Sequence, residues 1–113
     1  MTEPHDRPTA IELVEAVREF LERDVMTATE GRVQFHTRVA VNVMGMVQRE
    51  LELGPSQAAA HEARLDALGF ADEASLAAAI RGGEVDGRYD EIKAAVAATV
   101  RDKLLVANPK YLD

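Results

Sequence analysis

Hydrophobic residues recur near the start of the chain at intervals of three and four, which is the period of one face of an α-helix. The run begins at Ile11 and continues to Val25, with Glu and Arg at most of the positions between. Thr9 is followed three residues later by Glu12, a capping-box pattern that marks the start of a helix. The sequence therefore predicts an amphipathic helix from Thr9 to about Val25, followed by a break over residues 26–31.

The next stretch is apolar on nearly every side rather than on one face. Its middle, residues 39–47, is built almost entirely from Val, Ala and Met. A helix of this kind is normally enclosed by neighbours on several sides. Gly54 and Pro55 follow in the order that ends many helices. The pattern predicts one helix over residues 32–53 and a separate helix over residues 56–68.

Two further helices are predicted in the second half of the chain. One covers residues 72–81 and ends at a pair of glycines, and the other covers residues 89–107 and ends at an Asn-Pro pair. In this half Phe70, Leu76 and Ile80 are expected to be buried. One face of the last helix is expected to be apolar and to carry Ile92, Val96, Val100, Leu104 and Ala107.

These elements together define the predicted architecture. The chain is expected to be all-α, a compact bundle of about five helices with short connections. Residues 1–8 hold two prolines, which oppose helix, so they are expected to form a flexible N-terminal lead. Residues 9–113 are then expected to be a single helical domain, because no linker is long enough to divide them.

Composition narrows the possible classes of function. The chain has no cysteine, which excludes disulfides, thiolate catalysis and cysteine-based metal sites. Its net charge of −7 disfavours nucleic acid and membrane surfaces as partners, because both are bound through Lys and Arg. The sequence also lacks an apolar run near the roughly 20 residues that span a bilayer and an apolar signal-peptide core. We therefore expect a cytoplasmic protein.

Recognisable catalytic motifs are missing from the sequence. The histidines are scattered, and the His61-Glu62 pair that could open a zinc-protease helix lacks its second histidine, since position 65 is Leu65. The pair Gly82-Gly83 is not followed by the Lys and Ser or Thr of a phosphate loop. No serine lies in a nucleophile-elbow context. We therefore expect no enzyme activity, no metal site and no cofactor.

One polar set on the predicted helix over residues 32–53 is a candidate binding site. Arg38, Asn42 and Arg49 are spaced by four and seven residues, so they share a stripe of the helix, and the small Gly45 leaves room beside them. Two interpretations are open. The stripe can bind a small anion or carboxylate through arginine forks. Alternatively, Asn42 ties the helix to a neighbour and the arginines pair with acidic residues.

Five segments in this order and spacing resemble a known family. They are Asp6–Arg18, Phe35–Asn42, Arg49–Leu51, Ile80–Gly83 and Asn108–Tyr111. The family consists of small, uncharacterised bacterial helical proteins that occur beside, or fused to, aminoglycoside-phosphotransferase-like kinases and acyl-CoA dehydrogenases. The resemblance covers nearly the whole chain. It implies an accessory role near such enzymes and passes no catalytic role to any residue.

Two functions fit these observations. The first is an accessory or protein-interaction module that associates with itself, with a kinase-like protein or with an acyl-CoA dehydrogenase-like protein. The alternative is a helical bundle that binds a small anionic ligand, such as an acyl-CoA, at Arg38, Asn42 and Arg49. The apolar helix over residues 32–53 can belong to a dimer interface or to the interior of a monomer.

Overall fold

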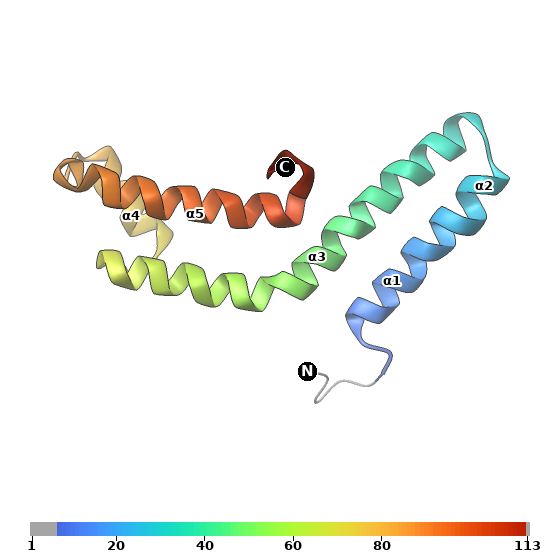
Figure 1. Cartoon of the computed structure of the whole chain (residues 1–113), viewed down its shortest axis with the longest axis horizontal. Helices are drawn as coiled ribbons and strands as arrows, with labels where there is room; N and C mark the ends of the chain where they lie inside the picture. Colours follow the sequence, from blue (N-terminus) through green and yellow to red (C-terminus); the bar gives the residue numbers. More distant parts are fainter. Residues whose placement is uncertain (1–6, 113) are drawn as a thin grey trace. The chain divides into compact units, whose positions relative to one another are not determined.

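The computed structural model describes residues 7–112, and within that range all regular structure is helical, which confirms the all-α class (Figure 1). The chain divides into two compact units, residues 1–54 and residues 55–113, which we call unit 1 and unit 2. Each unit is described by itself below. The assignment of residues 9–113 to a single domain stays a prediction, as does the lead over residues 1–8, most of which lies outside the described residues.

Unit 1 begins with the predicted amphipathic helix. Helix α1 spans Ala10–Phe20, a π-helical turn η1 spans Leu21–Val25, and α2 spans Met26–Ala28. The capping box is confirmed, because the Glu12 backbone N–H donates to the Thr9 hydroxyl at 3.2 Å and the Thr9 backbone N–H donates to the Glu12 carboxylate at 2.8 Å. The helix therefore starts where the sequence placed its start.

The break after this first helical segment is shorter than the predicted 26–31. Only Thr29 and Glu30 are non-helical, and Gly31 opens the next helix with φ of 65°, a left-handed conformation that favours glycine. The Gln34 side-chain amide donates to the carbonyls of Met26 and Thr29 at 3.1 and 3.0 Å. These bonds satisfy carbonyls that the end of the helix would otherwise leave unpaired.

The predicted helix end at Gly54-Pro55 is wrong. Helix α3 runs without interruption over Gly31–Leu68 with Pro55 inside it, so two predicted helices are one. With α1, η1 and α2 counted as one helix, the described residues form four helices and not five. Proline inside a helix removes one backbone donor and crowds the carbonyl four residues earlier, which can bend a helix without ending it. Gly54 does not adopt the positive φ that ends helices. The glycine that does adopt it is Gly69, with φ of 89°, directly after α3.

Unit 2 consists of the second part of α3 and two further helices. Helix α4 spans Glu73–Arg81 and α5 spans Tyr89–Ala107, close to the predicted ranges, with 3₁₀ turns η2 at Asp86–Arg88 and η3 at Pro109–Leu112. The Asp72 side chain caps α4 by accepting a hydrogen bond from the Ser75 backbone N–H at 2.8 Å. Local signals of this kind account for the accuracy of the predicted ranges.

The hydrophobic core lies in unit 2, where α3, α4 and α5 meet. Phe70 and Ala95 pack against its edge, as expected of Phe70. The prediction that Ile80 is buried is wrong, since Ile80 is 42% exposed. Val96 and Val100, on the predicted apolar face of α5, are also more than 40% exposed. The buried cluster consists of Leu65, Leu68, Leu76, Ala79, Val85 and Ile92.

Hydrogen bonds from one arginine connect the end of α3 to the start of α5. Arg88 donates from Nη2 to the Leu68 carbonyl at 3.0 Å and to Glu91 Oε1 at 2.8 Å. The hydrogen bond from Arg88 lowers the pKa of the Glu91 carboxyl. Since the last carbonyls of a helix lack partners within the helix, Arg88 supplies one at the point where α3 stops.

Unit 1 has almost no interior by comparison. Helix α1 lies alongside the first part of α3, as Figure 1 shows. Among the described residues of this unit only Val41 and Thr37 are buried, and the Thr37 hydroxyl donates to the Val33 carbonyl at 2.7 Å. Two helices in contact along one line can each bury only one narrow stripe. The enclosure expected for the apolar stretch 39–47 is therefore not provided within unit 1.

Candidate functional site

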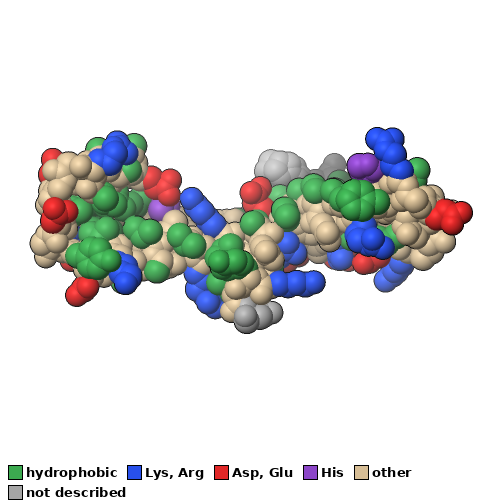
Figure 2. Space-filling model, turned by 90° about the horizontal axis from the view of Figure 1, so that it is seen from above, with side chains coloured by type: hydrophobic (Ala, Val, Ile, Leu, Met, Phe, Trp, Pro, Cys, Tyr) green, Lys and Arg blue, Asp and Glu red, His purple; other side chains and the backbone are tan. Residues whose placement is uncertain are grey.

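Unit 1 carries a large set of exposed hydrophobic side chains, which we call the open apolar face. Figure 2 shows hydrophobic side chains exposed on the surface of each unit. The side chains in unit 1 range from 37% to 58% exposed. A concentration of exposed hydrophobic side chains is typical of interaction sites on soluble proteins. The members are Leu13, Val17 and Phe20 of α1 and Val33, Phe35, Val39, Val43, Met46, Val47 and Leu51 of α3.

The two helices of unit 1 are tied together by polar groups along one side of their contact. Gln48 of α3 accepts a hydrogen bond from Arg18 Nε at 3.0 Å and donates one to Glu15 at 3.2 Å. Leu21 instead lines a shallow groove of about 400 Å³ with Val33 and neighbouring residues of α3. Counted at 3.6 residues per turn, the exposed apolar residues of α1 lie on the Leu21 side. The α1–α3 pair therefore leaves apolar residues of both helices uncovered, and two of those on α3, Val39 and Val43, point away from α1.

The predicted stripe Arg38, Asn42 and Arg49 lies on unit 1, and its residues do not line the grooves described in this section. Arg38 and Asn42 are exposed, whereas Arg49 is half-buried and has an interaction partner. A Cβ placed on Gly45 would lie 3.4 Å from Arg49 Nη1, so Gly45 does leave room for this arginine. Because Asn42 is exposed, the expected cost of an unpaired buried amide does not arise. A binding role for the stripe stays a prediction.

Unit 2 contains a groove that the sequence interpretation missed. The cavity has a volume of about 310 Å³ and lies between α3, α4 and α5. Its walls include Ile80, which was wrongly expected to be buried, Val96 and Val100 of the apolar face of α5, and two small residues, Ala77 and Ala95. Alanine leaves space where a larger side chain would fill the gap between helices. The alanine-rich pattern of α4 and α5 was the available signal, and it does not distinguish close helix packing from an open groove.

One end of this groove is polar. His61 Nε2 lies 3.0 Å from Glu73 Oε1, at ion-pair distance but without hydrogen-bond geometry, and His61 Nδ1 lies 3.4 Å from the Thr99 hydroxyl. Arg64 Nη2 donates to Asp102 Oδ2 at 3.0 Å, while Arg64 Nε is buried and has no hydrogen-bond partner. A buried unpaired donor of this kind costs roughly 1–3 kcal/mol. The groove thus combines apolar walls with an end at which polar groups are incompletely satisfied.

The polar end continues into a second, smaller cavity. This cavity has a volume of about 120 Å³ and shares five lining residues with the groove, among them His61, Arg64 and Lys103. Gln57 closes it from α3 by donating to the Asp102 backbone carbonyl at 2.9 Å. Within the described part of the chain, Lys103 forms no ion pair. The site can therefore accommodate an elongated molecule with an apolar body and a negative charge at one end.

Metal chemistry and membrane insertion have no counterpart among the described residues. Over residues 7–112, no three side chains of His, Asp or Glu come together in an arrangement that could hold a metal ion. In the same range, no helix is both long enough and apolar enough to cross a bilayer.

The fold and these two surfaces define the class of protein. It is an all-α protein with an open apolar face on the helices of unit 1 and a groove in unit 2 that has room for a small ligand. The chain belongs to the family described as Domain of unknown function (DUF6285), which matches residues 27–111. This result confirms the resemblance to an uncharacterised family. No curated protein and no solved structure matches the chain significantly.

Proposed function

We propose that this chain is a protein-interaction module that docks the open apolar face of unit 1 onto a helical surface of another polypeptide. The observation that carries the proposal is the exposure of hydrophobic side chains on both helices of unit 1, beside an interior of only Val41 and Thr37 among its described residues. Covering such side chains contributes about 25 cal/mol for each Å² removed from water. A helical partner is the natural cover, because ridges of side chains on one helix fit the grooves of another.

The proposal includes a set of candidate partners. A second copy of the chain is one. The resemblance described above suggests two others, a phosphotransferase-like kinase and an acyl-CoA dehydrogenase. No catalytic step is assigned to the chain in this proposal, since its role is to bind.

The test uses the full-length chain and one variant of the open apolar face. Val17→Asp combined with Val47→Asp places a charge on each helix of unit 1, at residues that are 46% and 38% exposed. Burying either charge in an interface is costly, so binding to the three candidate partners, measured by light scattering and calorimetry, should fall at least tenfold. Tyr89→Asp is the control, because Tyr89 is 65% exposed but lies in unit 2 and does not line the groove. Equal binding by the double variant and the parent would refute the proposal.

A second function is favoured by the groove of unit 2. We propose that it binds a small molecule with an apolar body and an anionic end, such as a fatty acid with its carboxylate or an acyl-CoA with its phosphates. The apolar walls would hold the body, and Lys103, which lines both cavities, would meet the anion.

Thermal shift measurements test the ligand proposal. Medium-chain fatty acids and acyl-CoAs should raise the melting temperature of the parent chain, and Lys103→Gln should weaken this effect. Lys93→Gln is the control, because Lys93 lies on the same helix over the Tyr89 ring, 5.8 Å from its centroid, and does not line the groove. A flat melting temperature across the panel would count against the groove as a ligand site.

A further inference from the structure

We infer that the occupant of the open apolar face is a second copy of the chain, with the two copies of α3 packed antiparallel about a two-fold axis at the level of position 41, on the side of α3 opposite the buried Val41 side chain. This inference rests on the proposed interaction function and specifies its partner. Three features of α3 support this inference. They are a row of exposed apolar residues, two residues of opposite charge that flank the row, and a spacing of these residues that is the same in both directions along the helix.

The row consists of Phe35, Val39, Val43 and Val47, each four residues after the one before. Residues spaced by four form a ridge along a helix, and such ridges are the elements that interlock when two helices pack. All four side chains are 38% to 58% exposed. The row is symmetrical about position 41, so a two-fold axis there sets Phe35 against the partner's Val47 and Val39 against the partner's Val43. The row on one copy of α3 can therefore pack against the same row on a second copy.

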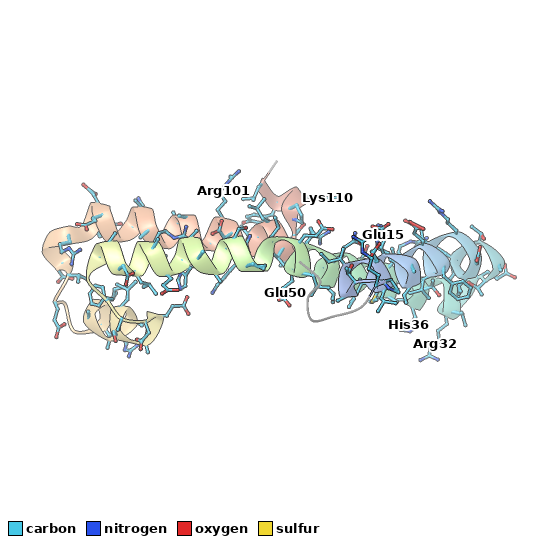
Figure 3. The ribbon with its side chains drawn as sticks, turned by 90° about the horizontal axis from the view of Figure 1, so that it is seen from below. Glu15, Arg32, His36, Glu50, Arg101 and Lys110 are labelled. Carbon is cyan, nitrogen blue, oxygen red and sulfur yellow. The ribbon has the colours of Figure 1, made fainter. Side chains whose placement is uncertain are left out.

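Charged residues end the row with opposite signs. Arg32 lies three residues before Phe35, and Glu50 lies three residues after Val47. They are 18 residues apart in the sequence, which is about five turns and about 27 Å along a helix, so both point to the same side. Figure 3 shows Arg32 and Glu50 on one edge of α3, with His36 between them.

The antiparallel arrangement is selected by these charges. In it Arg32 of each copy meets the partner's Glu50, and the interface gains two ion pairs. A parallel arrangement would place Arg32 beside the partner's Arg32 and Glu50 beside the partner's Glu50, which is unfavourable at both ends. A two-fold interface requires one surface to be complementary to itself, and this stretch of α3 meets that requirement in both shape and charge.

Cysteine cross-linking tests the geometry directly, because the chain has no cysteine of its own. Full-length Arg32→Cys and full-length Glu50→Cys are prepared separately and then mixed under mild oxidation. A disulfide requires Cα atoms within about 7 Å, whereas equivalent positions 32 of two antiparallel copies lie about 27 Å apart along the axis. We therefore expect a covalent dimer from the mixture and little from either variant alone. A covalent dimer from Arg32→Cys alone would overturn the antiparallel arrangement.

Charge reversal provides an independent measurement on the unmodified interface. Arg32→Glu should weaken dimerisation roughly tenfold, since two attractive contacts become repulsive. Arg32→Glu combined with Glu50→Arg should restore the parent affinity. Arg101→Glu is the matched control, because it makes the same change of charge at an exposed position in unit 2.

The outcomes separate this inference from the function on which it rests. A parent chain that is monomeric at 100 µM, roughly the range of weak specific association, would overturn self-association. If such a monomer still bound a kinase-like or dehydrogenase-like protein through the open apolar face, the interaction function would stand. Dimerisation with no response to the double charge reversal would overturn the proposed register alone.

Discussion

Unit 1 and unit 2 are both built from helices with apolar residues but cover those residues differently. In unit 2 three helices surround a cluster of buried residues that includes Leu65, Leu76 and Ile92. In unit 1 two helices leave most of their Val, Leu and Phe side chains half open to solvent. The contrast shows that helix formation and core formation are separate requirements, since amphipathic helices need enough neighbours to cover them. Unit 1 meets the first requirement and depends on another surface for the second.

The largest expected effect comes from truncating a buried side chain in unit 2. Leu76→Ala should lower the free energy of unfolding by about 3 kcal/mol, because it removes buried methyl groups and leaves a cavity in the core. Val43→Ala, at a side chain that is 46% exposed in unit 1, should cost well under about 1 kcal/mol in dilute solution. Urea unfolding of both variants at low protein concentration measures the difference. Equal losses would contradict the contrast between the two units.

A smaller effect is expected at the glycine that ends α3. Gly69→Ala should destabilise the chain by about 1–2 kcal/mol, because a side chain is strained at φ of 89°. No atom lies within 4 Å of the added Cβ, so the loss would come from the backbone alone.

Gly45→Ala in unit 1 sharpens the comparison. It should raise stability by up to about 1 kcal/mol, because that glycine lies in a helix interior and its Cβ would make an ordinary contact with Arg49. Thermal unfolding of the two variants should therefore shift in opposite directions.

The smallest effect concerns the two helix caps, one in each unit. The backbone N–H of Thr9 holds the pKa of Glu12 below its ordinary value, and the backbone N–H of Ser75 does the same for Asp72. Because both folded-state pKa values are lowered, the stabilisation is complete above the unfolded pKa values of about 4. It is lost as the pH falls through the folded values. Both carboxylates are exposed, so we expect a small effect.

Charge-removing variants isolate this cap contribution. Glu12→Gln and Asp72→Asn keep a side chain that can form hydrogen bonds. Each should melt below the parent at pH 7, and the difference should shrink by about pH 3, as followed by circular dichroism. A difference that persisted unchanged at pH 3 would show that the carboxylate charge is not responsible.

The sequence predicted helix starts and ends where the signal is local. The capping box of Thr9 and Glu12 depends on residues within one helical turn, and the structure confirms it. The two ends of α5 likewise depend on nearby residues, and the structure confirms the predicted range. The end predicted at Pro55 failed because the loss of one backbone donor does not stop a helix when the preceding glycine stays in the helical conformation.

Residues of the candidate sites were harder to predict, because exposure depends on how many elements pack around a helix. Asn42 lies in an apolar stretch that would be buried inside a larger bundle, yet it is exposed here. Val96 and Val100 follow the spacing of a buried face and instead line a groove. Periodicity shows which residues share a face of a helix. It does not show whether that face is covered.

The small interior of unit 1 has a consequence for its motions. With only Val41 and Thr37 buried among its described residues, separation of α1 from α3 exposes little additional apolar surface, so such openings are inexpensive and amide hydrogens there should exchange rapidly. A partner that binds only the closed form suppresses these openings by mass action, by about 2.7 kcal/mol at a hundredfold excess over its dissociation constant. The concentration of the partner would then determine how ordered the first half of the molecule is. If the partner is a second copy, this is the concentration of the chain itself.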